Sequence, residues 1–146
     1  MKIKVKMLRE GARLPKLATG GSAACDLYAL LDEPITLQPG RRYPVPTGIA
    51  IALPDSGYVA VVCARSGLAL KRGLALANGI GVIDSDYRGE LFVAIINNDD
   101  KPQIIENGER IGQLMIMPVI AAEYEPADEL DETERGEGGF GSTGIK

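Results

Sequence analysis

The chain has 146 residues, of which 45% are hydrophobic and 25% are charged, and this length and composition suit one globular domain. It contains no histidine, which excludes Ser-His-Asp and Cys-His catalysis and histidine-ligated zinc. The formal net charge of −4 disfavours a nucleic-acid partner, and no apolar run approaches the roughly 20 residues of a membrane span.

Strict alternation of apolar and basic residues predicts the first strand, in which Ile3, Val5 and Met7 face one side and lysines face the other. The same period of two returns over residues 41–53, where prolines near the start favour an edge or irregular strand. The other elements predicted for the first half are a loop over residues 11–21, a short strand carrying Asp26 within 23–31, a hairpin turn at 54–57 and a core strand over 58–64.

One short helix is expected in the first 120 residues, within the apolar stretch 68–76. The dipeptide Asn78-Gly79 that follows is typical of a hairpin turn. A strand over 91–96, a loop over 97–102 and a last long strand over 110–119 complete the pattern. Short strands at regular spacing, separated by Gly and Pro turns, indicate an all-β protein with the architecture of a sandwich, barrel or jelly roll.

Cys25 and Cys63 are the only cysteines, and they form no C-x-x-C pair. We interpret them as two reduced thiols of a cytoplasmic protein, and one disulfide between them stays open as an alternative. The charged N-terminus lacks the apolar block of a signal peptide, which agrees with a cytoplasmic location.

The last 24 residues differ in composition from the rest of the chain. Residues 123–134 contain seven acids and no base, and residues 135–146 are rich in glycine. Neither stretch has the apolar residues needed to form a core. We therefore predict a β domain over residues 1–122, an acidic spacer over 123–134 and a mobile glycine-rich arm over 135–146.

The glycine-rich arm has the composition of an anion-binding segment. Glycines leave backbone N–H groups free to surround a phosphate, while Ser142 and Thr143 add hydroxyl donors and Arg135 adds a fixed positive charge. Phe140 stands alone among glycines and could stack on a base. A disordered tail without a ligand fits the same composition.

Other polar segments could also carry chemistry, although each has a plain structural alternative. The segment Arg65–Gly67 follows the core strand and suits an anion, but it also suits a strand-terminating turn. Asp84 and Asp86 share a face if their segment is extended and could bind a metal or activate water, whereas acids in turns usually cap the backbone. The remaining candidates are Asp26, isolated in an apolar strand, and Arg110 and Gln113, which interrupt the last strand.

Together and in this order, five segments resemble the five motifs of the trimeric deoxyuridine triphosphate nucleotidohydrolases, the dUTPases. The segments are Ala24-Cys25-Asp26-Leu27, Arg65-Ser66-Gly67-Leu68-Ala69, Gly81 to Glu90, Gly108 to Leu114 and Arg135 to Gly144. The third and fifth are highly specific, whereas the others are weak singly. Ala24 stands where the family usually has glycine and Ala64 where it often has proline, and neither position carries a catalytic side chain.

The resemblance implies a jelly-roll-like β fold of the β-clip type, assembled as a homotrimer whose active sites each draw on all three subunits. The C-terminal arm of one subunit would close over a site built by the other two. The implied reaction is hydrolysis of dUTP to dUMP and pyrophosphate with Mg²⁺, which keeps uracil out of DNA and supplies dUMP for thymidylate synthesis. The expected partners are therefore these nucleotides, pyrophosphate and the neighbouring subunits, with no nucleic acid and no membrane.

The resemblance also implies a role for each matched residue. Asp84 is the general base that orients the water attacking the α-phosphorus, and Asp26 holds hydrated Mg²⁺ through water, together with the triphosphate. The residues assigned to the phosphates are Arg65, Ser66 (also catalytic), Gly67, Arg135, Ser142 and Thr143, and Gly141 is assigned to the substrate without a named part of it. The residues assigned to the base and sugar are Asn78, Ile83, Tyr87, Gln113 and Phe140.

Selectivity follows from these assignments. A tight pocket near Asn78 leaves no room for a thymine methyl group, and polar groups that pair with uracil stay unmatched by cytosine. Tyr87 lies against the deoxyribose and blocks a 2′-hydroxyl. Arg110 is expected to be structural, bonding between strands or subunits.

Three alternatives remain at this stage. A dCTP deaminase shares the fold but needs a catalytic glutamate at the base, whereas this chain has Asp84. A bifunctional deaminase and dUTPase is the second. A non-catalytic jelly-roll binding module is the third, and it would have no need for five polar motifs.

Overall fold

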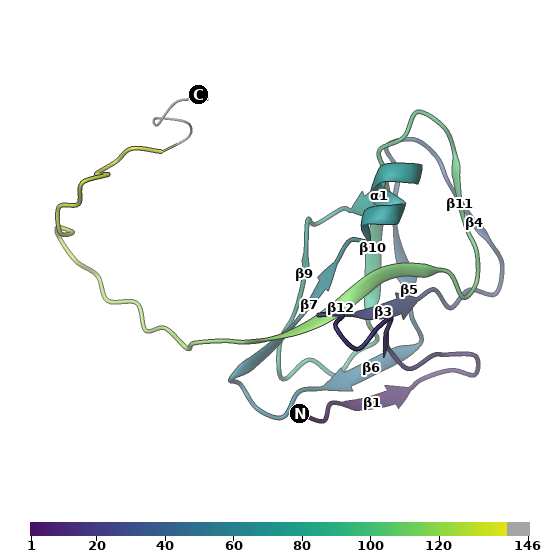
Figure 1. Ribbon diagram of the computed structural model, residues 1–146, viewed down its shortest axis with the longest axis horizontal. Coiled ribbons are helices and arrows are strands. Elements are labelled where there is room, and N and C mark those ends of the chain that lie inside the picture. The colour runs from purple at the N-terminus through teal and green to yellow at the C-terminus, as the bar shows by residue number, and fades with distance from the viewer. Residues whose placement is uncertain (140–146) are drawn as a thin grey trace.

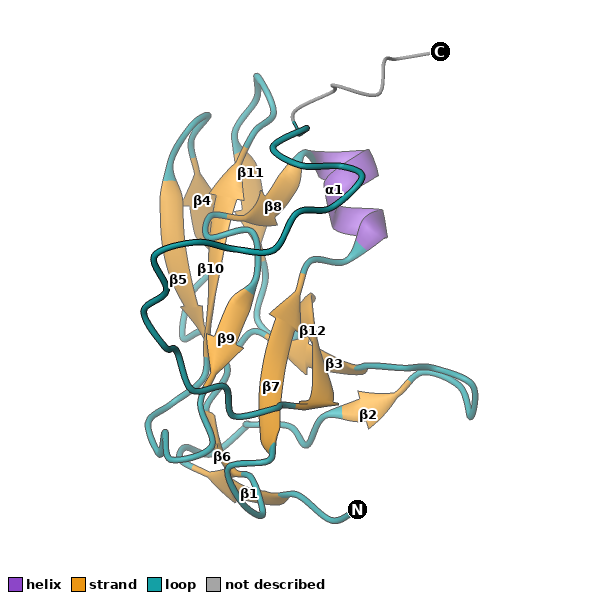
Figure 2. Ribbon diagram, turned by 90° about the vertical axis from the view of Figure 1, so that its left-hand side faces the viewer, coloured by secondary structure: helices purple, strands orange, loops and turns teal. Residues whose placement is uncertain are grey.

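The computed structural model describes residues 1–139, whose strands lie in four sheets (Figures 1 and 2). In chain order the strands are β1 (Lys4–Met7), β2 (Lys16–Leu17), β3 (Cys25–Tyr28), β4 (Ile35–Leu37), β5 (Arg42–Pro46), β6 (Ile49–Ala52), β7 (Tyr58–Cys63), β8 (Leu74–Leu76), β9 (Gly81–Ile83), β10 (Phe92–Asn97), β11 (Gln103–Ile105) and β12 (Arg110–Pro118). The one helix among these residues, α1 (Ser66–Arg72), lies between β7 and β8.

The largest sheet has five antiparallel strands in the order β2-β3-β12-β7-β9. The long strand β12 is central, and its Gln113 pairs with Asp26 of β3 on one side and with Cys63 of β7 on the other. The smaller sheets are β5-β10-β8, β1-β6 and β11-β4. These findings confirm the predicted all-β, jelly-roll-like fold with one short helix, although the sheets do not close into a barrel.

The core is built from apolar residues of strands in several sheets. Gly112 of β12 lies against Val93 of β10, and a Cβ atom at Gly112 would come within 3.3 Å of that side chain. Burying a side chain of this size stabilises the fold by about 1.5–3 kcal/mol. The residues with at most 2% exposure are Leu27, Val45, Ile49, Ala60, Val62, Leu74, Leu91, Val93, Ile95, Asn97, Ile105 and Ile111.

The single strand predicted over residues 41–53 is wrong, because the segment forms two strands in different sheets. Strand β5 pairs with β10, and β6 pairs with β1. Gly48 separates them with a φ of +70°, and a Cβ atom there would come within 2.3 Å of Leu30 Cδ2. A residue other than glycine would be strained in this conformation and would also clash. The predicted inner face is largely buried, but Tyr43 is exposed, as is Met7 in β1.

Both predicted hairpins are also wrong. Residues 54–57 connect β6 to β7, and residues 77–80 connect β8 to β9, but neither pair of strands is hydrogen-bonded to each other. The turn at Asn78 and Gly79 is present, with a φ of +72° at Gly79. Turn residues determine the local bend, whereas strand pairing is decided by packing between distant segments.

The helix begins earlier than predicted, at Ser66, and it ends where Gly73 adopts a φ of +60°. The rest of the predicted apolar stretch, residues 74–76, is strand β8. Strands β2, β4 and β11 were missed, since each has only two or three residues and lies among turn-forming residues.

Residues 119–139 contain no helix or strand, and nearly all of them are exposed (Figure 1). Ile120 and Tyr124 have exposed fractions of 92% and 95%. The segment is tied to the domain at its start, where the N–H of Val119 donates to the carbonyl of Gly57 at 2.8 Å. The predicted division into spacer and arm stays a prediction. Within residues 1–139, no helix has the length and apolar character needed to cross a membrane.

Candidate active site

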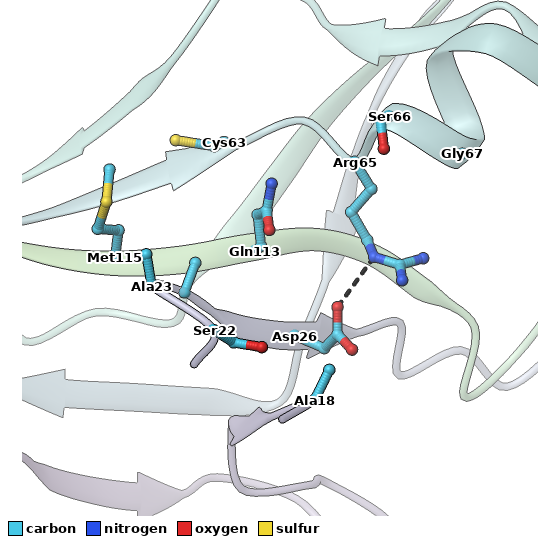
Figure 3. A pocket seen from close by; sticks show the side chains of 11 residues that line it. Ala18, Ser22, Ala23, Asp26, Cys63, Arg65, Ser66, Gly67, Gln113 and Met115 are labelled. Carbon is cyan, nitrogen blue, oxygen red and sulfur yellow. Dashed lines mark ion pairs between the residues drawn. The ribbon is translucent and has the colours of Figure 1, made fainter. Parts of the chain in front are cut away.

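One cavity of about 390 Å³ lies where β3, β7 and β12 meet the start of α1 (Figure 3). Five residues that the sequence singled out line it together: Asp26, Arg65, Ser66, Gly67 and Gln113. They come from three motifs that are far apart in sequence. The antiparallel pairing of β12 with both β3 and β7 brings these motifs side by side.

Asp26 is the electrostatic centre of this cavity. Its side chain is 10% exposed, and its two oxygens accept from Arg65 Nε at 2.9 Å and from Arg110 Nη1 at 3.1 Å. Figure 3 shows Arg65 reaching from the end of β7 towards Asp26 on β3. Asp26 and Arg65 line one wall of the cavity and Arg110 lies behind Asp26, so these three side chains together carry one net positive charge. Such a wall favours an anionic ligand.

The other polar groups of the cavity are held by backbone contacts. Gln113 Nε2 donates to the carbonyl of Ala64 at 2.9 Å, which fixes the side-chain amide beside the start of α1. Ser66 is exposed, so its hydroxyl is accessible to a ligand. Gly67 is exposed as well, and a Cβ atom there would meet nothing within 4 Å. The cavity therefore combines a cation, a hydroxyl and open space, which suits a phosphate group.

Asp84 lies in a second, smaller cavity of about 240 Å³, together with Ile83 and Tyr87. The condition under which Asp84 and Asp86 would share a face is not met, because β9 ends at Ile83 and a turn follows. In this turn the N–H of Tyr87 donates to the carbonyl of Asp84 at 3.2 Å. The Tyr87 hydroxyl donates to the carbonyl of Glu90 at 3.0 Å, which fixes the ring over the turn.

The two cavities lie at opposite ends of β7. Ile83 of β9 pairs with Ala60, so Asp84 lies near the beginning of β7, whereas Ser66 follows its end. The six steps from Ala60 to Ser66 span roughly 20 Å in an extended chain. One chain therefore does not bring Asp84 and Ser66 to the same ligand atom.

Asn78 lies in the turn before β9, with its Nδ2 atom 3.8 Å from the position of a Cβ atom on Gly81. Strand β9 is an edge of the five-stranded sheet, since it pairs only with β7. An edge strand has unpaired backbone N–H and C=O groups along its free side. These groups are available to pair with a ligand that has both donors and acceptors.

The predicted arm residues are only partly described. Arg135 is exposed, and its carbonyl accepts from the N–H of Gly138 at 3.0 Å. Phe140, Gly141, Ser142 and Thr143 lie outside the described residues.

The donor set limits how a metal ion fits this cavity. Asp26 is the one carboxylate that lines it, and both of its oxygens accept from arginines. Residues 1–139 contain no group of three His, Cys, Asp or Glu side chains that could hold a metal ion. The contact of Asp26 with a divalent cation through water, which the family resemblance implies, stays a prediction. The described residues do not form a complete set of direct ligands.

Both cysteines are free thiols, and the fold excludes the disulfide between them. Cys25 of β3 and Cys63 of β7 lie on opposite sides of β12, so two strand spacings of about 4.8 Å separate their backbones. A disulfide needs Cα atoms closer than about 7 Å. Burial, and secondarily the charge of Asp26, raises the pKa of the Cys25 thiol above its usual 9.0.

Sequence reasoning missed part of this network. Arg110 was expected to be structural, but the identity of its partner Asp26 was not foreseen, because 84 residues separate them. Ser22 also lines the cavity and carries no recognisable signal in its Gly-rich surroundings. A further ion pair, between Arg72 and Glu109, joins α1 to the residue before β12 and was not predicted.

Comparison with known proteins identifies close relatives. A family model described as dUTPase matches residues 10–144. A deoxyuridine 5′-triphosphate nucleotidohydrolase of Desulfitobacterium hafniense is 53% identical over 99% of this chain and 97% of that protein. A protein of the same name from a Hydrogenobaculum species is 52% identical over the full length of both.

Solved structures with the same fold include phage dUTPases. A mutant dUTPase of Staphylococcus bacteriophage 80alpha with dUpNHpp superposes with a TM-score of 0.86 at 29% identity, covering 99% of both chains. A mutant dUTPase from phage phi11 of S. aureus, described with a structural Mg(II) ion, gives a TM-score of 0.81 at 25% identity, covering 90% of this chain and all of that one.

Proposed function

The chain belongs to the dUTPase family, and from that premise we propose that it hydrolyses dUTP to dUMP and pyrophosphate. The observation that carries the proposal is the cavity in which Asp26, Arg65, Ser66 and Gln113 meet. Relatives that are about half identical over the whole chain are named for this activity. Such an enzyme would keep uracil out of DNA and supply dUMP for thymidylate synthesis.

In this proposal the cavity binds the phosphates on both sides of the bond that breaks. The Arg65 guanidinium contributes charge, Ser66 contributes a hydroxyl, and the bare Gly67 lets a phosphate approach the backbone. The net positive charge of this wall attracts a triphosphate although the whole chain carries −4. Mg²⁺ bound with the triphosphate would neutralise part of its charge, with Asp26 contacting the ion through water.

Asp84 acts as the general base. It orients a water molecule on the α-phosphorus and accepts a proton as the oxygen–phosphorus bond forms. The bond from the α-phosphorus to the bridging oxygen then breaks, and pyrophosphate leaves. Exposure of the Asp84 side chain in the second cavity supports this role, because water and substrate can both reach it.

The separation of Asp84 from Ser66 along β7 supports a site shared between copies of the chain. We propose a homotrimer in which the phosphate cavity of one subunit faces the Asp84 cavity of the next. The arm of a third subunit, with Arg135, Phe140, Gly141, Ser142 and Thr143, would then close over base and γ-phosphate. The exposure of residues 119–137 supports an arm that reaches a neighbour.

Uracil is recognised along the edge strand β9 in this proposal. Unpaired backbone groups up to Ile83, together with the exposed side chain of Asn78, offer donors and acceptors that match uracil. The Tyr87 ring, held through its hydroxyl by Glu90, would lie against the deoxyribose and exclude a 2′-hydroxyl. Gln113, fixed on Ala64, would contact the base or its ordered water.

The decisive experiment on the chemistry is Asp84→Asn, with Asp86→Asn as a matched control in the same turn. We expect Asp84→Asn to abolish pyrophosphate release while dUpNHpp still binds, because the amide keeps the shape and loses the base. The control should keep most of its activity, since no described side chain bonds to Asp86. Normal turnover by Asp84→Asn would refute the assignment of the base.

A further inference from the structure

We propose that Arg72 and Glu109 form a positioning pair, which holds α1 so that Arg65 and Ser66 meet the phosphates of the substrate. The proposal rests on the proposed function and extends it to residues outside the cavity. Neither Arg72 nor Glu109 lines the cavity, so a direct role in binding is not implied.

Helix α1 has little that holds it in place by itself. It has seven residues and no side-chain hydrogen bond at its N-cap, and Leu68 is its one buried residue. A helix this short is unstable in isolation, so its direction depends on what its two ends contact. On the exposed side, Leu70 has an exposed fraction of 87%.

At the C-terminal end of α1, the N–H of Asn98 donates to the carbonyl of Gly73 at 2.9 Å, and the side chain of Arg72 contacts two further segments, β11 and Glu109. Arg72 donates through Nε to Gln103 Oε1 at 3.1 Å, through Nη2 to the carbonyl of Ile104, and through Nη1 to the Glu109 carboxylate. The other oxygen of Glu109 accepts from the N–H of Glu106 at 3.1 Å, which fixes the carboxylate. The Arg72 and Glu109 side chains are only 26% and 22% exposed, so the pair is partly shielded from water.

The N-terminal end of α1 is held at the neighbouring position of β12. Arg65 contacts Asp26, and Asp26 also contacts Arg110, the residue that follows Glu109. Arg65 Nη1 also donates to the carbonyl of Arg110 at 3.4 Å. Both ends of the helix are thus bonded to consecutive residues, Glu109 just before β12 and Arg110 at its start. Ser66 and Arg72 are separated by about 9 Å along the helix axis. Releasing Arg72 leaves the C-terminal end of the helix held by Gly73 and strand β8, so the helix can shift by a small tilt.

Such a tilt changes the fit of phosphates more than the fit of the base. Of the residues assigned to uracil and deoxyribose, Asn78, Ile83 and Tyr87 lie on β9 or in the turns beside it, which Arg72 does not contact. Gln113 is the exception among the described residues, because it lies on β12 and bonds to Ala64 beside the start of α1. A purely structural role would instead change stability and leave the relative affinities of different ligands unchanged. The ratio of affinities for a triphosphate and a monophosphate therefore distinguishes the two roles.

The experiment compares Arg72→Met with Lys71→Met in the full chain. Lys71 is exposed, lies in the same last turn, and the substitution removes the same charge. Dissociation constants are measured by calorimetry for dUpNHpp and for dUMP. We expect Arg72→Met to raise the dissociation constant of dUpNHpp by about tenfold and that of dUMP by less than about threefold, while Lys71→Met changes neither constant. Glu109→Gln should lower the affinity for dUpNHpp by a similar factor. The double variant, Arg72→Met with Glu109→Gln, should bind dUpNHpp about as weakly as either single variant.

Equal weakening of both ligands by Arg72→Met, or no weakening, would overturn the positioning role. If circular dichroism shows that Arg72→Met does not fold, Arg72→Lys is measured in its place. Lysine keeps the positive charge but lacks the guanidinium group that bonds to both β11 and Glu109. We then expect the affinity for dUpNHpp to fall by about threefold and the affinity for dUMP to stay unchanged. An unchanged affinity for dUpNHpp would overturn the proposal. If the unsubstituted chain binds neither nucleotide, it is the proposed function that fails.

Discussion

Replacing Asp26 with asparagine tests whether one carboxylate organises the phosphate cavity. The two oxygens of Asp26 accept from Arg65 at 2.9 Å and from Arg110 at 3.1 Å. An asparagine has the same shape, but its amide nitrogen can only donate, so one guanidinium faces another donor. The variant also leaves two positive groups without a counter-charge.

The expected cost follows from the exposure of the two arginines. Breaking a fully buried pair costs about 3–5 kcal/mol, and an exposed pair contributes about 0.2–1 kcal/mol. Side-chain exposure is 24% for Arg65 and 50% for Arg110, so both pairs lie between these limits. We expect a loss of about 2 kcal/mol in the free energy of unfolding, which lowers Tm by about 6 °C for a domain of this size.

Thermal unfolding at pH 7, followed by circular dichroism, measures this loss directly. Glu33→Gln is the control, because Glu33 is exposed and makes no described ion pair, and its Tm should stay within about 1 °C of the unsubstituted chain. If Asp26→Asn unfolds at the same temperature as this control, the double ion pair does not hold the strand ends together.

Three further outcomes are expected. Gly73→Ala should lower the free energy of unfolding in urea by about 1–3 kcal/mol. Gly73 has a φ of +60°, and an added Cβ atom would lie 2.8 Å from Asp99 N, so an unchanged urea midpoint would contradict the expected strain. Because burial and the Asp26 charge raise the pKa of Cys25, its alkylation followed by mass spectrometry should reach half its maximal rate at a higher pH in the folded chain than in the urea-unfolded chain, and at a lower pH in folded Asp26→Asn; equal midpoints for the folded and unfolded chain would contradict this. Deleting residues 135–146 should leave a folded chain with little dUTP hydrolysis, whereas unfolding would show that the arm belongs to the core.

Local patterns in the sequence predicted those features that depend on neighbouring residues. The apolar run around Val62 is strand β7, and the long stretch from Arg110 is β12. The short motifs with Asp26, Arg65 and Gln113 do meet in one cavity. Each motif is a few residues long and lies at the end or in the middle of a predicted strand, so its position in the secondary structure could be predicted from the sequence.

Pairing between distant strands could not be predicted in the same way. The turn at Gly79 looks like a hairpin in sequence, yet its flanking strands pair with β10 and β7. Alternation across Gly48 looks continuous, because contact with Leu30 appears only in the folded chain. The ion pair of Arg72 with Glu109 spans 37 residues and carries no local signal.

The distance between Asp84 and Ser66 is the clearest example. Their motifs were assigned to one active site from the family resemblance, and the fold of one chain places them at opposite ends of β7. No local pattern encodes that separation, because it results from the register of β9 on β7. The proposed shared site accommodates it through a second copy of the chain.

The most direct test of the central claim is pyrophosphate release from dUTP, dTTP, dCTP and UTP, each with Mg²⁺ and with EDTA. We expect pyrophosphate release from dUTP alone, at a rate that EDTA lowers, because separate groups of the protein recognise the base, the sugar and the phosphates. Turnover of UTP or dTTP at a similar rate would contradict the proposed recognition of sugar or base. No turnover of any nucleotide would contradict the proposed activity, and ammonia release from dCTP would indicate a deaminase instead.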